Sequence, residues 1–143
     1  MRGLVLGLLV LLHASGALAC NGFLGVNYAE INARQILVEG LIRSVRPVRP
    51  IREAVVDHAF EIEVRSTLKG PALRSWTVLV TMQGVYSDWP EKGAVYIGFE
   101  LVDPFHGVGR IRGHRACRPI GIVRATPENL RKIETNIIED SRW

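Results

Sequence analysis

The chain has 143 residues, 48% of them hydrophobic, and a formal net charge of +4. This length suits one domain with its own core, and so mild a charge does not by itself indicate a nucleic-acid-binding protein. The apolar run from Leu4 to Leu12 is too short to span a bilayer, and no later run is longer.

Residues 1–19 have the three parts of a secretory signal peptide. Arg2 provides the positive start, the apolar run follows, and Ala17-Leu18-Ala19 offers the small-x-small pattern that a signal peptidase cuts. We therefore expect a signal peptide at 1–19 and a single domain at 20–143, which is secreted or periplasmic. That domain keeps 17 lysines and arginines against 14 acidic residues, a net charge of +3.

The chain has two cysteines, Cys20 and Cys117. In an oxidising compartment an even pair indicates a disulfide, which here would close a loop of nearly the whole domain. Such a bridge contributes on the order of 4 kcal/mol in the chain-entropy account. The alternative is a lipoprotein, because Ala17-Leu18-Ala19-Cys20 is similar to a lipidation signal. In that case Cys20 would be anchored in a membrane and Cys117 would lack a partner.

The first elements after this start are a helical turn and a strand. Residues 28–33 are compatible with one short helical turn, and residues 34–45 with a strand. Gly40 lies inside that strand, which predicts a bulge or a sharp bend.

Residues 43–52, RSVRPVRPIR, place an arginine at every third position: Arg43, Arg46, Arg49 and Arg52. Pro47 and Pro50 favour polyproline II, which has three residues per turn, so the four guanidinium groups would line one edge. Two interpretations stay open. The segment is either a solvated basic connector between strands or an arm that docks on an acidic partner.

Residues 54–70 are predicted to form an unusually long strand. Apolar residues and His58 alternate with polar ones, which predicts one face in the core and one in water. The inward set is His58, Phe60, Ile62, Val64 and Leu68, and the outward set includes Asp57, Glu61 and Glu63. A strand this long is typically bent and shared between two halves of a closed sheet.

Three further strands and a helix complete the pattern. Strands are predicted at 75–82, 93–102 and 108–116, with a loop at 83–92 that carries Tyr86 and Trp89. Thr126 and Pro127 are suited to begin a helix, and Leu130, Ile133, Ile137 and Ile138 form its apolar stripe. The fold class is therefore mainly β: an OB-fold-like five-stranded Greek-key barrel with a C-terminal helix, or else an open β-sandwich.

The sequence shows no catalytic constellation. No serine lies in a nucleophile-elbow context, and His58 lies on the inward side of its strand. No HxxxH, HExxH or CxxC spacing is present, so we expect no metal site, no cofactor and no enzyme activity. A second basic group, Arg110, Arg112, His114, Arg115 and Arg118, is compatible with either an anion-binding face or the wet side of an edge strand.

Taken in order, several motifs resemble the netrin-like domain, in particular the amino-terminal domain of tissue inhibitors of metalloproteinases and its bacterial relatives. They are Cys20 at the mature start, QILVEGLIRSV, FEIEVRSTLKG with its Lys-Gly turn, GAVYIGFEL, and Cys117 followed by a helix. The resemblance implies an OB-fold barrel with a Cys20–Cys117 bridge. In the animal inhibitors a Cys-x-Cys start chelates the zinc of the protease, whereas Cys20 is followed here by Asn21 and Gly22.

The expected function is that of an exported, monomeric, non-enzymatic protein-binding module. The partner-binding residues would be Cys20 and Asn21 together with the four arginines of 43–52. The resemblance implies an extracytoplasmic zinc metalloprotease as partner, inhibited through the amine and carbonyl of Cys20. The alternatives are an OB-fold that binds an anionic polysaccharide or nucleic acid, although nucleic acid is not expected outside the cytoplasm, and a structural envelope lipoprotein.

Overall fold

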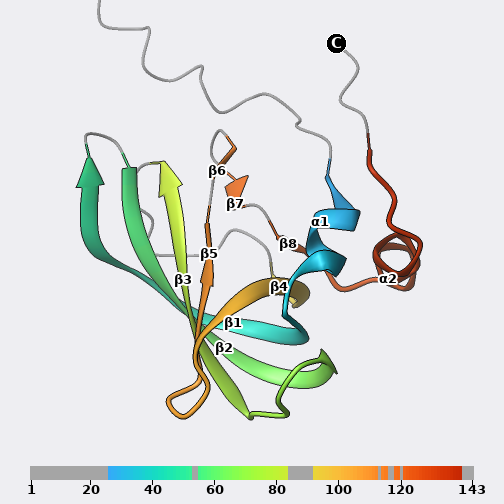
Figure 1. The fold of residues 1–143 in the computed structure, drawn as a ribbon, viewed down its shortest axis with the longest axis horizontal. Helices are drawn as coiled ribbons and strands as arrows, with labels where there is room; N and C mark the ends of the chain where they lie inside the picture. Colours follow the sequence, from blue (N-terminus) through green and yellow to red (C-terminus); the bar gives the residue numbers. More distant parts are fainter. Residues whose placement is uncertain are drawn as a thin grey trace, which may run out of the picture.

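The structure is a computed structural model that describes residues 26–52, 55–83, 92–112, 114–115, 118–119 and 121–139. Figure 1 shows a strongly bent sheet with two short helices beside it. The elements in chain order are α1 (Tyr28–Ala33), β1 (Ile36–Arg52), β2 (Val55–Lys69), β3 (Ser75–Gln83), β4 (Ala94–Asp103), β5 (Val108–Ile111), β6 (His114–Arg115), β7 (Arg118–Pro119), β8 (Ile122–Arg124) and α2 (Pro127–Glu134).

Five strands close into a barrel. The order β1-β2-β3-β5-β4 is completed by antiparallel pairing of β1 with β4, and β3 pairs with β5 in parallel. Closure leaves few free edges, which is how a small antiparallel sheet protects its backbone groups. This confirms the mainly β, OB-fold-like barrel with a C-terminal helix. The short strand β8 pairs with residues 95–97 of β4, on the edge that faces away from β1.

The longest strand, β1, is shared between the halves of the barrel, whereas the sequence predicted such sharing for residues 54–70. Residues 36–41 of β1 pair with β4 on one side and β2 on the other, whereas 42–52 pair with β2. The register shifts at Gly40, where a Cβ would lie 2.7 Å from the Glu63 carbonyl oxygen. The predicted bend at this glycine is therefore confirmed, because no other residue leaves room for that crossing.

The core lies inside the barrel and centres on two aromatic rings. Trp76 and Phe99 meet edge to face with 5.1 Å between ring centroids, a favoured aromatic geometry. His58 is fully buried beside this core, as predicted from its parity. Leu68, by contrast, was expected inside and is 41% exposed, because it lies at the far end of β2, next to the turn at Gly70.

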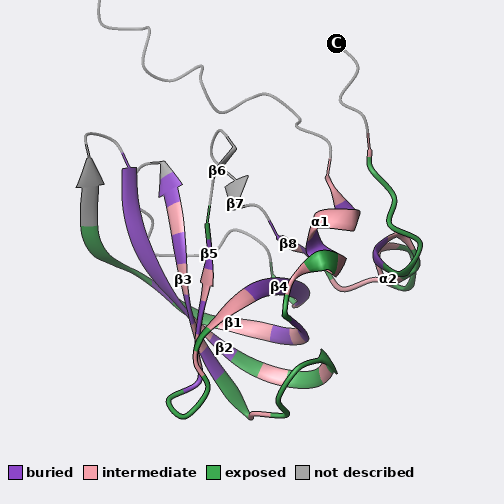
Figure 2. Cartoon of the chain, in the orientation of Figure 1, coloured by how far each residue is buried: buried purple, intermediate pink, exposed green. Residues whose placement is uncertain are grey.

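Helices α1 and α2 pack together on the outer side of β4. Their shared apolar cluster contains Tyr28, Ile31, Leu37, Tyr96, Val123 and Ile133, so residues 95–99 of β4 are buried on both faces (Figure 2). Thr126 accepts a hydrogen bond from the Asn129 amide, which confirms it as the N-cap of α2. The predicted stripe is only partly right, because Ile137 and Ile138 lie beyond the helix and are exposed.

Two predicted boundaries are wrong. Residues 43–52 are not a polyproline II connector, because β1 continues through them to Arg52. The fifth strand, expected at 108–116, ends at Ile111. It is also not an edge strand, because β3 and β4 flank it on both sides.

Within the described ranges no helix is long and apolar enough to cross a membrane.

Candidate binding face

The arginines of β1 are spaced differently from the residues of β2 that pair with them. Arg46, Arg49 and Arg52 are three residues apart and lie opposite Ala59, Asp57 and Val55, which are two apart. Each step is absorbed by a register shift, one between Pro47 and Arg49 and one between Pro50 and Arg52. A bulge places one extra residue on one strand, so a period of three on β1 meets a period of two on β2.

Each described arginine side chain of this segment reaches a carboxylate of β2. The nitrogen–oxygen distances are 2.7 Å for Arg43–Glu63, 3.6 Å for Arg46–Glu61 and 3.3 Å for Arg49–Asp57. We call this set the arginine face: Arg43, Arg46 and Arg49 with Asp57, Glu61 and Glu63. It covers the outer surface of the β1–β2 pair, where the exposed half of β1 lies beside β2 (Figure 2).

Asp57 is the buried centre of the arginine face, with a side chain only 2% exposed. One oxygen accepts a hydrogen bond from the Thr81 hydroxyl at 2.7 Å. The other lies 3.3 Å from Arg49 and 3.4 Å from Arg110. Strand β3 supplies Thr81 and strand β5 supplies Arg110, so four strands of the barrel meet at this carboxylate.

The pKa of Asp57 lies below its ordinary value. Burial would raise it, but the hydrogen bond from Thr81 and the charges of Arg110 and Arg49 outweigh the burial. Asp57 is thus an ionised, fully partnered carboxylate under the arginines. The prediction that it faces water is wrong, because its outward side is covered by the arginines that it binds.

The three arginines themselves remain displayed to solvent. The side chains of Arg43, Arg46 and Arg49 are 57%, 62% and 66% exposed although each is ion-paired. The Arg43–Glu63 and Arg46–Glu61 pairs are exposed at both partners, and such pairs contribute little to stability, typically up to about 1 kcal/mol. The three pairs place the guanidinium groups over β2, beside its carboxylates.

The outer edge of the same half of β1 is poorly suited to pairing with another strand. Pro47 and Pro50 have no backbone N–H, and the flanking arginines add charge. Proline and like charge are the usual means of preventing edge-to-edge association of sheets. This edge of β1 is therefore unsuited to extension of the sheet by another strand.

The other residues predicted for the site divide into two groups. Cys20, Asn21 and Cys117 lie outside the described residues, as do Tyr86 and Trp89, so the disulfide and the amino-terminal contact stay predictions. For Arg52 the strand is described but the side chain is not.

His58 is a core residue, as expected. Its Nδ1 lies 3.1 Å from the Val56 carbonyl oxygen, and burial lowers its pKa against the effect of that contact. A buried, neutral imidazole at this position is suited to packing and not to exchanging protons with a substrate.

Sequence reasoning missed the contribution of Thr81 and Arg110. Arg110 was assigned to an edge strand, but its side chain is only 21% exposed and reaches Asp57 from β5. These residues are 24 and 53 positions away from Asp57 in the chain. The parallel pairing of β3 with β5 that joins them leaves no local signal in the sequence.

No group of three or more His, Cys, Asp or Glu side chains suited to a metal ion occurs in the part of the chain that the structure describes. Comparison of the chain with protein-family models, with characterised proteins and with solved structures returns no match. The netrin-like resemblance therefore stays a prediction, and the site has to be interpreted from its own geometry.

Proposed function

We propose that this chain is an exported, non-enzymatic protein-binding module that docks an acidic protein surface on its arginine face. The observation that carries the proposal is the display of three well-exposed arginines, each with its guanidinium group paired to a carboxylate of β2. Displayed charges steer a partner of opposite charge and set its register. A side chain that is already held in an ion pair loses less conformational entropy on binding.

The interleaved carboxylates favour a protein partner over a polyanion. A nucleic acid or an anionic polysaccharide presents closely spaced negative charge, which would meet Glu61 and Glu63 between the arginines. OB-folds that bind single strands also use aromatic platforms. In the described part of β1, β2, β3 and β5, Phe60 and Trp76 are buried in the core, so the outer surface of these strands has no aromatic platform.

The experiment is binding of the mature chain to proteins from the extracytoplasmic fraction of its native cells. The captured partner is identified by mass spectrometry, purified and titrated against variants. R43E/R46E reverses two exposed charges and leaves Arg49 with Asp57. We expect at least tenfold weaker binding and a strong dependence on salt.

The matched control is K92E/R131E, which reverses the same amount of charge at two exposed positions, one just before β4 and one on α2. Thermal unfolding of each variant verifies that the fold is intact. Equal binding by R43E/R46E and the wild type, or equal loss in both variants, would show that the arginine face is not the docking surface.

A narrower proposal follows from the netrin-like resemblance: the partner is an extracytoplasmic zinc metalloprotease, and the amine and carbonyl of Cys20 chelate its zinc. The test compares the mature protein with a form that carries one extra residue before Cys20, on a panel of zinc proteases. Inhibition by the mature form alone supports chelation, and equal potency excludes it. Intact mass of the mature protein shows whether Cys20 is lipidated or oxidised to Cys117.

A further inference from the structure

The turn between β4 and β5 is tightly held by one carboxylate. Asp103 accepts hydrogen bonds from the amides of Phe105 at 2.9 Å and His106 at 3.2 Å, and its second oxygen lies 2.7 Å from Nδ1 of His106. These contacts with His106 also hold the pKa of Asp103 below its ordinary value. Gly107 then adopts a positive φ of 62°, and its carbonyl accepts a hydrogen bond from Thr77 at 2.8 Å.

This ordered turn presents an aromatic ring to solvent. Phe105 is 94% exposed, more than any other large hydrophobic residue of the described chain. None of the contacts that hold the turn involves its ring, so the conformation of the turn does not require an aromatic side chain. A fully exposed phenylalanine on a rigid support has the geometry of a binding anchor, because it enters a pocket with little loss of entropy.

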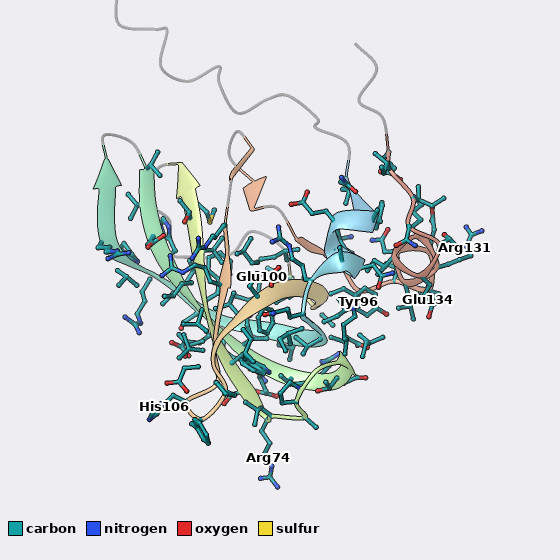
Figure 3. All side chains as sticks on the ribbon, in the orientation of Figure 1. Arg74, Tyr96, Glu100, His106, Arg131 and Glu134 are labelled. Carbon is teal, nitrogen blue, oxygen red and sulfur yellow. The ribbon has the colours of Figure 1, made fainter. Side chains whose placement is uncertain are left out.

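The end of the barrel that carries Phe105 also carries a basic residue. Val102, near the end of β4, is 54% exposed. Gly107 lies against Leu73 and the Ser75 carbonyl, so the segment that carries Arg74 adjoins the turn. Arg74 is exposed, and Figure 3 shows Arg74 and His106 pointing outward at the same end of the barrel. The end of the barrel that carries the turn therefore also displays a positive charge.

A lipid surface is the weaker candidate for the occupant. One aromatic ring buries less apolar area than a myristoyl chain, and a single myristoyl chain alone gives only marginal membrane binding. A protein pocket encloses the ring from several sides and excludes water around it, which is how a few aromatic residues supply most of the affinity of an interface. Phe105 is a single ring on an ordered turn, which suits a protein pocket better than a lipid surface.

We propose that Phe105 is an apolar anchor that inserts into a hydrophobic pocket with an acidic rim on a protein partner, the rim pairing with Arg74. This inference rests on the proposed function, because it assigns a second contact surface of the same binding module. It differs in place, since the arginine face lies on β1 and β2 and the anchor lies on the β4–β5 turn.

The first test replaces Phe105 with the photoreactive residue p-benzoylphenylalanine in the native cells. The expected result is a crosslinked protein adduct of one defined mass. In the matched control the same photoreactive residue replaces Val102, which is exposed near the end of β4, and at most a weak adduct is expected. No adduct from position 105, or an equal spread of adducts from both positions, would overturn the anchor.

The second test titrates F105A and V102A against the purified crosslinked partner. Loss of an aromatic anchor weakens binding by about 30-fold or more, whereas V102A should change it less than about fivefold. Flotation with vesicles of equal parts phosphatidylcholine and phosphatidylglycerol is run in parallel. Flotation of the wild type but not of F105A would assign the ring to lipid and overturn the protein pocket.

The outcomes separate the two proposals. If F105A binds normally while R43E/R46E does not, the anchor is wrong and the binding module stands. If neither crosslinking nor capture by the wild-type chain yields a protein, the proposed function itself is wrong.

Discussion

The two faces of β2 between Asp57 and Ile62 differ in how they are buried. The inner face places Phe60 and Ile62 among apolar neighbours of the barrel core. The outer face buries Asp57 just as deeply, but against arginine side chains that reach it from β1 and β5. Burial on the inner face therefore depends on apolar packing, and burial of Asp57 on the outer face depends on ion pairs and on the hydrogen bond from Thr81.

The inner face should be the more sensitive to truncation. Phe60 is fully buried, so Phe60→Ala removes a large side chain and leaves a cavity, which should cost about 4 kcal/mol of unfolding free energy. Urea denaturation measures this loss. Glu61→Ala at the adjacent outward position is the control and should cost less than about 1 kcal/mol. Similar losses in both variants would mean that the two faces do not differ in this way.

The second largest effect is expected at Asp57. Asp57→Asn keeps the shape but removes the charge that faces Arg49 and Arg110, and we expect a loss of about 2 kcal/mol in unfolding free energy. Thr81→Val removes one hydrogen bond to the same carboxylate and should cost about 1 kcal/mol. If Asp57→Asn is as stable as the wild type, the carboxylate does not organise the outer face.

The two faces also differ in their response to pH. Because the folded pKa of Asp57 is depressed, its contribution to stability is fully present above the unfolded value of 3.8 and disappears as the pH falls through the lower folded value. Unfolding free energies measured between pH 6 and pH 2 should fall less steeply for Asp57→Asn than for the wild type. Phe60→Ala should shift the whole curve without changing its slope, and identical slopes in all three proteins would remove Asp57 from this role.

The inner face could be predicted from the sequence, and the outer face only in part. Alternation along residues 54–70 places Phe60, Ile62 and His58 correctly, because a period of two predicts the face of the sheet on which each side chain lies. It does not report exposure, which is why Asp57 was expected in water. The bulges of β1 could not be predicted either. Arginines at every third position next to prolines indicate polyproline II as well as a bulged strand when the paired strand is unknown. The contact between Arg110 and Asp57 depends on barrel closure, which no local pattern encodes.

The smallest effect on stability should come from Arg43, and it separates folding from binding on the outer face. Its guanidinium pairs with Glu63, and both side chains are more than half exposed, so Arg43→Ala should change the unfolding free energy by less than about 0.5 kcal/mol. Binding to the partner should nevertheless weaken, because the displayed charge is lost. Arg49→Ala, which also removes a partner of buried Asp57, should reduce both stability and binding. If Arg43→Ala destabilises the fold as much as Arg49→Ala does, the exposed arginine serves the barrel, and the electrostatic docking surface has to be sought elsewhere.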